Sequence, residues 1–169
     1  MPTKRRETKM KLYHGTNTEF NSIDLSKSQH GKDFGKGFYL SSEKHQAEKL
    51  AIFKALQLGG DAIVQTYEID DSFMNDNSLK ILYFDGYSKE WAEFILRNRN
   101  NMSDINIHNY DIVYGPIAND KVGIQIRNFL EHNIDFDTFV NRIKFLKGIT
   151  FQYYFGSQKA IEMLTRVYE

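Results

Sequence analysis

Apolar and polar positions along the chain follow two periods, and segments with the period of a strand are the more numerous. Residues 62–70 alternate between apolar and polar side chains, and residues 149–157 are the most strand-prone stretch, rich in aromatic side chains. The same criteria predict strands at 10–13, 37–41, 79–84 and 110–118. We expect the first of these to end in a polar turn at "HGTN", residues 14–17.

Segments with a helical period alternate irregularly with the strands. The clearest one follows Ser41 and Ser42, either of which can act as the N-cap, and it ends at Gly59 and Gly60. Near-helical spacing is shared by Ala47, Leu50, Ala51, Lys54 and Leu58. Further helices are predicted at 88–99, with Ser88 as the cap, and at 122–132, 136–146 and 158–167.

These elements together predict an α+β fold in a single domain. Strands outnumber long helices, and neither a regular strand–helix alternation nor an internal repeat is present. The 169 residues can build one sizeable core but not two full domains. We expect one domain over 11–169, preceded by a flexible basic tail over 1–10. The expected core includes Trp91, Phe94, Tyr153, Phe155, Ile161 and Leu164.

Charge and composition exclude several classes of protein. Lys and Arg number 22, as do Asp and Glu, so no overall field favours nucleic acid or a membrane. The chain has no cysteine, which excludes a disulfide scaffold, a thiolate metal site and a cysteine nucleophile. There is no apolar run long enough to span a membrane and no recognisable secretory signal, so we expect a cytoplasmic protein. No HExxH or comparable cluster indicates a metal.

The segment "GKDFGKG", residues 31–37, places three glycines directly before Phe38 and Tyr39. Glycine permits positive φ and close backbone approach, so the segment can simply be a turn. It is a poor match to a phosphate-binding P-loop, because no Ser or Thr follows the lysine and the spacing is not GxGxxG. Taken alone, the segment does not indicate a function, and it must be considered together with other motifs in the chain.

Three motifs occur in a defined order: "YHGT" at residues 13–16, "FGKGFYLS" at 34–41, and a polar Gln152 in the last predicted aromatic strand. Together they resemble the ADP-ribosyltransferase superfamily, in its diphtheria-toxin and poly(ADP-ribose) polymerase branch. A closer likeness, covering nearly the whole chain, is to a family of short bacterial proteins thought to be divergent members of that superfamily. The chain shares with them "YDIVYGPIANDKV" at 110–122 and "QYYFGSQKA" at 152–160.

The resemblance implies two small, packed, mostly antiparallel sheets around a cleft for NAD. It implies that His14 binds the adenine-side ribose, that the Gly15 backbone takes the nicotinamide carboxamide, and that Tyr39 stacks on the nicotinamide ring. Thr16 would add a ribose hydrogen bond. Phe34 and Gly37 belong to the same cofactor-binding set, since the glycines let the segment wrap closely around NAD.

The chain departs from the superfamily at two places. The position of a second stacking tyrosine is Leu50, and Phe53, one turn further along the predicted helix, is the candidate replacement. The catalytic glutamate corresponds to Gln152, which still bonds a ribose hydroxyl but has no charge and cannot act as a base. Losing the charge-assisted bond costs about 1 to 2 kcal/mol, or roughly a tenfold to thirtyfold slower step.

Other polar residues are weighed as candidates beside a plain structural role. Glu68 is either a solvated strand carboxylate or a replacement acid or base, and Glu93 with Arg97 is either a surface pair or part of an acceptor site. Asp120 either makes local backbone bonds or faces the cleft. By the period of the strand, Tyr154 shares the face of Gln152 and is a candidate cleft residue. His30, beside the glycines, is either a loop residue or a phosphate contact.

The resulting hypothesis is a metal-independent mono-ADP-ribosyltransferase that uses NAD as substrate, with catalytic residues His14, Tyr39 and Gln152. The acceptor would be a protein or a nucleic acid, and the protein would be a bacterial toxin or effector with an antitoxin or immunity protein as a partner. The alternative is a weak or inactive module that binds NAD or ADP-ribose. A third possibility, an interaction domain that has only inherited the fold, predicts no nucleotide binding.

Overall fold

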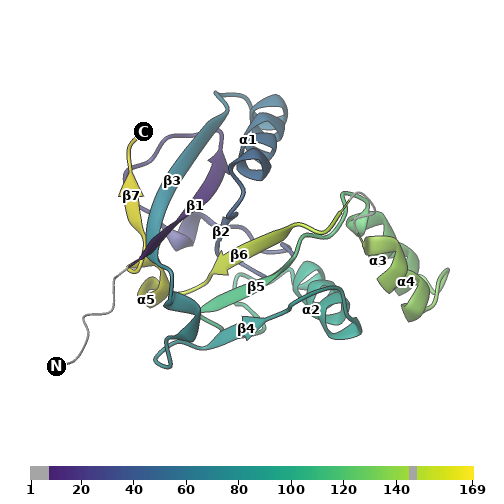
Figure 1. Cartoon of the computed structure of the whole chain (residues 1–169). Coiled ribbons are helices and arrows are strands. Elements are labelled where there is room, and N and C mark those ends of the chain that lie inside the picture. The colour runs from purple at the N-terminus through teal and green to yellow at the C-terminus, as the bar shows by residue number, and fades with distance from the viewer. Residues whose placement is uncertain (1–7, 145–147) are drawn as a thin grey trace.

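Two small β-sheets form the centre of the molecule in the computed structural model, which describes residues 8–144 and 148–169 (Figure 1). The first sheet has the strand order β1–β3–β7 and the second the order β2–β6–β5–β4. The strands of one sheet run at a steep angle to those of the other, and the helices lie around both. The predicted α+β class with two small sheets is confirmed for the described residues.

The first sheet is antiparallel throughout. β1 (Lys9–Thr16) pairs along its whole length with β3 (Ile63–Asp70), and β7 (Thr165–Val167) pairs with the other edge of β3. At the free edge of β1, Tyr13 and Ser41 exchange two backbone hydrogen bonds of 2.8 Å. This bridge joins the two sheets, so β1 lies at their junction.

The second sheet is centred on β6 (Phe151–Phe155). This strand is antiparallel to β2 (Phe38–Leu40) on one side and to β5 (Ile112–Pro116) on the other. β4 (Ile81–Tyr83) completes the sheet and pairs with β5 in parallel. Both sheets are thus mostly antiparallel, as expected.

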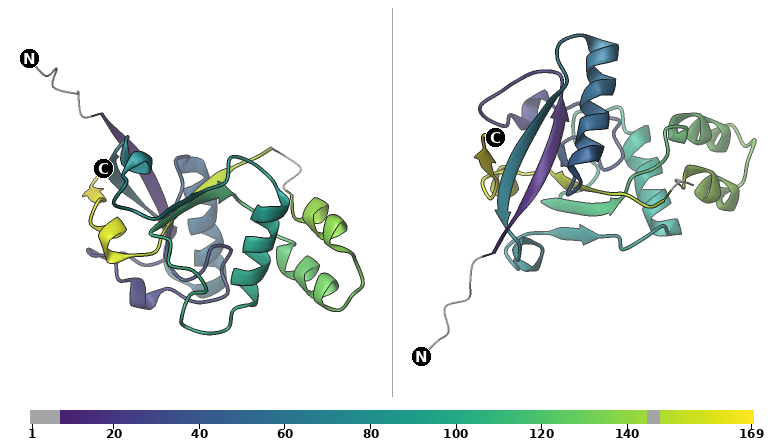
Figure 2. Two further views of the ribbon diagram at one scale, coloured as in Figure 1. Left: turned by 90° about the horizontal axis from the view of Figure 1, so that it is seen from below. Right: turned by 45° about the horizontal axis from the view of Figure 1, so that its top comes forward.

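Five helices surround the sheets in the described residues: α1 (Lys44–Leu58), α2 (Lys89–Asn100), α3 (Val122–Leu130), α4 (Phe136–Ile143) and α5 (Gln158–Ile161). α1 packs against β1, whereas α3 and α4 pack on each other in a lobe far from the first sheet, as both views of Figure 2 show. Single 3₁₀ turns lie at Leu25–Lys27 and Phe73–Asn75. None of these helices is long and apolar enough to cross a bilayer.

Two clusters of buried side chains hold the elements together. One joins the second sheet to α2, α3 and α4 and includes the fully buried Trp91 and Phe139, with the Trp91 indole donating to the Pro116 carbonyl at 2.9 Å. The other draws on both sheets and includes Leu12 and Phe155. Every residue expected in the core belongs to one of the two clusters or packs against it.

Several predicted boundaries hold, and Ser88 caps α2 by accepting from the Trp91 amide at 3.0 Å, as predicted. The turn predicted at residues 14–17 is wrong, because β1 continues to Thr16 through its pairing with β3. β1 also starts at Lys9, inside the segment expected to be a tail, and residues 1–7 of that segment lie outside the described residues.

Two predicted helices end early. The segment 158–167 is helical only to Ile161 and then forms β7, whose pairing with β3 overrides the helical pattern. The helix predicted at 136–146 ends at Ile143, and its last two predicted residues, 145 and 146, lie outside the described residues. The expected serine cap of α1 is also wrong. The hydroxyl of Ser41 accepts from the Glu43 amide at 3.0 Å, while Glu43 occupies the cap position without a side-chain bond.

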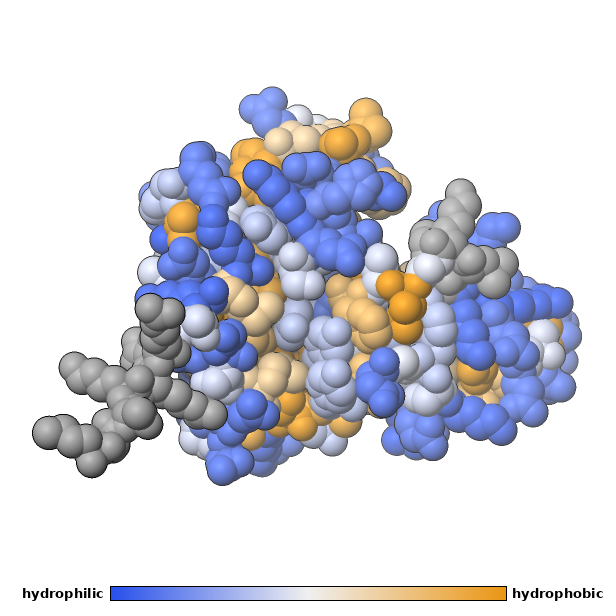
Figure 3. Space-filling model, in the orientation of Figure 1, coloured by the Kyte–Doolittle hydropathy of each residue, from blue (hydrophilic) through white to orange (hydrophobic). Residues whose placement is uncertain are grey.

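The inward face of α1 is narrower than its sequence predicts. Ala47 and Ala51 are buried, whereas Leu50 and Leu58 are 39% and 73% exposed. The helix lies so close to β1 that a Cβ on Gly15 would come within 2.2 Å of the Ala47 carbonyl oxygen. Only small side chains fit such a contact, so the larger apolar ones remain outside, where Figure 3 shows hydrophobic residues at the top of the molecule.

Candidate functional site

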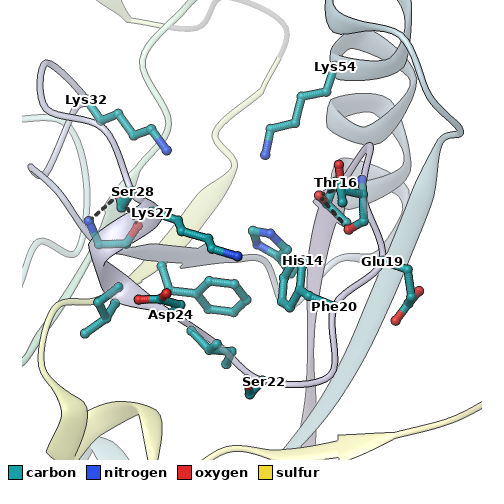
Figure 4. Close-up of a pocket in the computed structure, with 15 residues that line it drawn as sticks. His14, Thr16, Glu19, Phe20, Ser22, Asp24, Lys27, Ser28, Lys32 and Lys54 are labelled. Carbon is teal, nitrogen blue, oxygen red and sulfur yellow. Dashed lines mark hydrogen bonds between the residues drawn. The ribbon is translucent and has the colours of Figure 1, made fainter.

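A cleft lies where β1, α1 and the glycine-rich segment 31–37 meet. Its larger cavity, of about 390 Å³, lies over the loop that follows β1 (Figure 4). A second cavity of about 270 Å³ lies toward β6, and the two share four lining residues: His14, Lys32, Gly37 and Lys54. The larger volume is in the range of small-molecule sites, which is about 300 to 1,000 Å³.

His14 stands at the junction of the two cavities. Its Nδ1 lies 2.7 Å from the carbonyl oxygen of Tyr39, and its ring stacks on Phe38 with centroids 4.0 Å apart. Burial, with help from the nearby Lys54 ammonium, lowers the pKa of His14 to about 3 against the bond to Tyr39. Because a carbonyl only accepts, Nδ1 carries the proton of this neutral ring, which leaves Nε2 as a hydrogen-bond acceptor.

Tyr39 holds the glycine-rich segment in place. Its hydroxyl donates to the Gly35 carbonyl at 2.6 Å and accepts from the Phe34 amide at 3.0 Å, and its ring lines the smaller cavity with Lys32 Nζ 5.5 Å from the ring centroid. Burial raises the pKa of Tyr39 well above its usual range, so it remains a neutral phenol. The tyrosine therefore organises the segment as well as lining the cavity.

The glycines of this segment are required by its close packing. Gly35 has φ of +97°, and a Cβ on Gly37 would come within 2.1 Å of the Tyr154 ring. Tyr154 is buried beneath the segment, and its hydroxyl donates to the Lys36 carbonyl at 2.9 Å. The candidate role of Tyr154 as a cleft residue is therefore wrong: it supports the segment from below.

Gln152 lies on the floor of the smaller cavity beside Asp33 and Arg99. The guanidinium of Arg99 is 3.4 Å from Asp33 Oδ1, and Gln152 lies close enough to lower the pKa of that carboxyl. No hydrogen bond of good geometry reaches Asp33 Oδ1 or Gln152 Nε2, although both atoms are buried. Asp33 Oδ1 is therefore held by the charge of Arg99, and polar atoms that are buried without a close hydrogen bond cost stability.

Three lysines direct their ammonium groups into the cleft around His14. Figure 4 shows Lys27, Lys32 and Lys54 converging there, and within the described part of the chain none of them forms an ion pair. Burial lowers the pKa of Lys32, and burial together with Lys32 lowers that of Lys54 to about 8. A wall of unpaired ammonium groups indicates an anionic ligand.

The same cavity also contains two carboxylates, but both are engaged with other groups. Glu19 pairs with Arg166 at 2.8 Å, and Asp24 accepts from the Ser26 amide and hydroxyl at 3.0 and 2.6 Å. Lys27 also helps to lower the pKa of the Asp24 carboxyl, so Lys32 and Lys54 are the cations most available to a ligand.

Gly15 and Thr16 are more constrained than the resemblance implies. The carbonyl of Gly15 accepts from Lys54 Nζ at 2.9 Å, and Gly15 lines a third, smaller cavity instead of the main two. Thr16 lines the larger cavity, but its hydroxyl is bonded to the backbone of Thr18 at 3.2 Å. Phe34 is fully buried under the segment and lines none of these cavities.

Phe53 does not lie in the cleft: its side chain is 55% exposed on the outer side of α1. Leu50, at the position expected for a second stacking ring, lines the smaller cavity, and Lys54 is the next α1 residue that faces it. The replacement of a stacking tyrosine by Phe53 is therefore wrong for this structure.

The remaining candidates lie outside these cavities. Glu93 and Arg97 form an exposed ion pair of 2.7 Å on α2, and Asp120 is exposed after β5. Glu68 lies opposite Lys11 in the first sheet. His30 lines a separate hollow with Arg99, and its Nδ1 has no partner. Within the described residues, no group of three or more His, Cys, Asp or Glu side chains is arranged to hold a metal.

Four further charged residues line the smaller cavity and belong to none of the expected site residues: Lys32, Asp33, Lys54 and Arg99. Lys54 had a visible signal, because it shares the helical spacing of Ala47 and Ala51 and so is a charge on the inward face. Lys32 and Asp33 stand among the glycines, where a charged residue is easily taken for loop surface. Arg99 has no local signal, since only the tertiary fold brings it to Asp33.

Comparison with known proteins gives a family but no activity. No curated protein and no solved structure matches the chain. Residues 10–165 match the family described as "Protein of unknown function (DUF3990)". Since this match covers most of the 169 residues, including all three motifs, the chain belongs to the DUF3990 family.

Proposed function

We propose that this protein has an ADP-ribosyltransferase-like fold and is an NAD-dependent mono-ADP-ribosyltransferase. The observation that supports this most directly is that His14, Tyr39 and Gln152, from three motifs far apart in the sequence, line one cavity of about 270 Å³. They come from β1, β2 and β6, so the shared cavity is a property of the fold and not of sequence proximity.

The polar groups of the cleft match the parts of NAD. The free Nε2 of His14 accepts a bond from a ribose hydroxyl, and the Tyr39 ring offers a surface for the nicotinamide. The diphosphate would lie among Lys27, Lys32 and Lys54 in the adjoining cavity. The Gly15 carbonyl can accept from the carboxamide with its second lone pair while Lys54 occupies the first.

Transfer breaks the bond between ribose C1′ and the cationic nicotinamide nitrogen. Both electrons of the bond go to the nicotinamide, which leaves as a neutral molecule, so no acid needs to protonate it. The positive charge that develops on the ribose is stabilised by nearby lone pairs and negative groups. Gln152 supplies a lone pair to the ribose hydroxyl but no charge. This favours transfer of one unit over chain elongation.

The second candidate is a binding module for NAD or ADP-ribose. The uncharged Gln152 and the absence of a second stacking ring at Leu50 favour it. Binding would then persist without turnover, because the lysines and His14 are still available to the ligand.

Incubation with radiolabelled NAD tests both candidates. We expect the wild type to release nicotinamide and to label a protein or nucleic-acid fraction of a host lysate, and the variants His14→Ala, Tyr39→Ala and Gln152→Ala to do so more slowly. NAD binding detected by calorimetry without turnover would favour the binding module. If the protein neither binds NAD nor turns it over, both candidate functions are rejected.

A further inference from the structure

We propose that Asp33 supplies the carboxylate that position 152 lacks, and that it accepts the proton of the attacking acceptor. This inference rests on the proposed function, since it names a second participant in the same reaction. Asp33 lies in the glycine-rich segment, whereas the superfamily glutamate would lie on β6, so the charge has moved from one wall of the cavity to another.

The position of Asp33 is the first support. It lines the same cavity as His14, Tyr39 and Gln152, and it lies beside Gln152. Oδ1 of Asp33 is buried without a hydrogen-bond partner, as is Nε2 of Gln152. Oδ1 is also the atom that faces the Arg99 guanidinium at 3.4 Å, so the carboxylate is held by charge and not by a close hydrogen bond, and it keeps acceptor capacity for a hydroxyl of the ligand.

The segment that carries Asp33 is held firmly, as a catalytic group requires. The Tyr39 hydroxyl bonds both the Phe34 amide and the Gly35 carbonyl, and the Gly35 amide donates to the Lys32 carbonyl at 3.1 Å. These bonds lie on both sides of Asp33, so its backbone has little freedom.

The electrostatic surroundings suit a base. Burial raises the pKa of the Asp33 carboxyl, and it outweighs the opposing effects of Arg99 and Gln152. A carboxylate with a raised pKa takes up a proton more readily near neutral pH. Charged and titratable groups from every neighbouring element face the same cavity: His14 (β1), Lys32 (the segment itself), Tyr39 (β2), Lys54 (α1) and Arg99 (α2).

The step balances in atoms and electrons. The C1′–nitrogen bond breaks and its electron pair leaves with nicotinamide, while an oxygen lone pair of the acceptor forms the new bond to C1′. The acceptor's O–H proton passes to the Asp33 carboxylate, which becomes a carboxylic acid and later returns the proton to solvent. With water as the acceptor the products are nicotinamide, ADP-ribose and one proton.

A purely structural role is the competing explanation, because Asp33 and Arg99 tie the glycine-rich segment to α2 with a 3.4 Å ion pair. The experiment must therefore remove the negative charge from position 33 and restore it at a neighbouring position in the same cavity. Asp33→Asn keeps the shape of the side chain, and Gln152→Glu returns a carboxylate to the neighbouring wall of the cavity. The double variant has lost the ion pair but regained the charge.

We would measure nicotinamide release with water as the acceptor, together with NAD affinity by calorimetry and thermal unfolding, for the wild type, both single variants and the double variant. Asp33→Asn should slow release about a hundredfold while NAD affinity is kept, as expected when only the transition state loses an interaction. The double variant should recover most of that loss. Asp137→Asn, which removes the exposed ion pair with Lys89, is the control and should behave as the wild type.

Each outcome has one meaning. Unchanged release by Asp33→Asn would overturn the proposal, and so would a loss that Gln152→Glu does not recover, since that indicates a structural ion pair. No release by the wild type, either with water or with the host lysate as the source of the acceptor, would reject the proposed function itself. In the Gln152→Glu single variant, a like charge beside Asp33 should move the acidic limb of the pH profile upward, which a structural role does not predict.

Discussion

The cleft and the α3–α4 lobe bury their side chains in opposite ways. In the lobe, Val122, Ile126, Phe139, Val140 and Ile143 are buried and apolar, and they contribute to a single packed cluster. In the cleft, a neutral histidine, two lysines with lowered pKa values and a carboxylate whose Oδ1 has no close hydrogen bond line one small cavity. The lobe is built as stability requires, whereas the cleft keeps buried polar groups that cost stability.

The lobe should show the largest effect on folding. Phe139→Ala removes a ring that is fully buried between Phe129 and Phe136, and it should lower the free energy of unfolding by about 3 to 5 kcal/mol. Denaturant unfolding measures this loss. NAD affinity, measured well below the melting temperature, should stay unchanged. A milder Phe139→Leu variant is the control, and a parallel loss of NAD affinity there would contradict the separation of the two regions.

A substitution in the cleft should raise the free energy of unfolding, whereas one in the lobe lowers it. The pKa of Lys54 is lowered from 10.5 to about 8 in the folded state, so its charge opposes folding below pH 8, and stability should rise with pH from about 8 to 10.5. Lys54→Met should therefore raise the unfolding free energy at pH 7 by about 1 to 2 kcal/mol, allowing for partial solvation and for the bond to Gly15.

The same variant should weaken NAD binding, because the diphosphate loses a cation. Lys49→Met, the same substitution at an exposed position of α1, should change neither quantity appreciably. A Lys54→Met protein that is less stable than the wild type would show that this lysine belongs to the structural framework and not to the site.

The smallest effect should come from the surface of α2. Glu93→Gln removes an exposed ion pair with Arg97, and it should change the unfolding free energy by less than about 0.5 kcal/mol. Nicotinamide release should not change. Slower release of nicotinamide would instead indicate that this pair takes part in the reaction.

The sequence predicted α2, the two helices of the lobe and much of the sheets because their signals are local. Ser88 as a cap and the alternation at 62–70 depend on near neighbours, and both appear in the structure. β7 was missed because Thr165–Val167 has no strand pattern of its own and depends on pairing with β3. The inward face of α1 was overestimated because its limit is a tertiary contact with Gly15.

The motifs predicted only some of the residues that line the cleft. They named His14, Tyr39 and Gln152, which line one cavity, but they placed Phe53 there instead of Lys54. The motifs did not indicate Asp33, whose carboxyl group acquires its properties from the adjacent Arg99 and Gln152. These three side chains become neighbours only when the glycine-rich segment, α2 and β6 pack together in the fold. No local sequence pattern therefore predicts their contact.

The most direct test of the account is calorimetric titration of NAD into the wild-type protein at pH 8, in two buffers of different ionisation enthalpy. Near this pH, Lys54 is about half protonated, and an anionic diphosphate should raise its pKa again. We predict binding with uptake of up to about half a proton by Lys54, which Lys54→Met should remove and which should fade toward pH 6. Absence of binding, or binding with no such uptake, would contradict the claim that the lysines of this cleft are retained for the diphosphate of NAD.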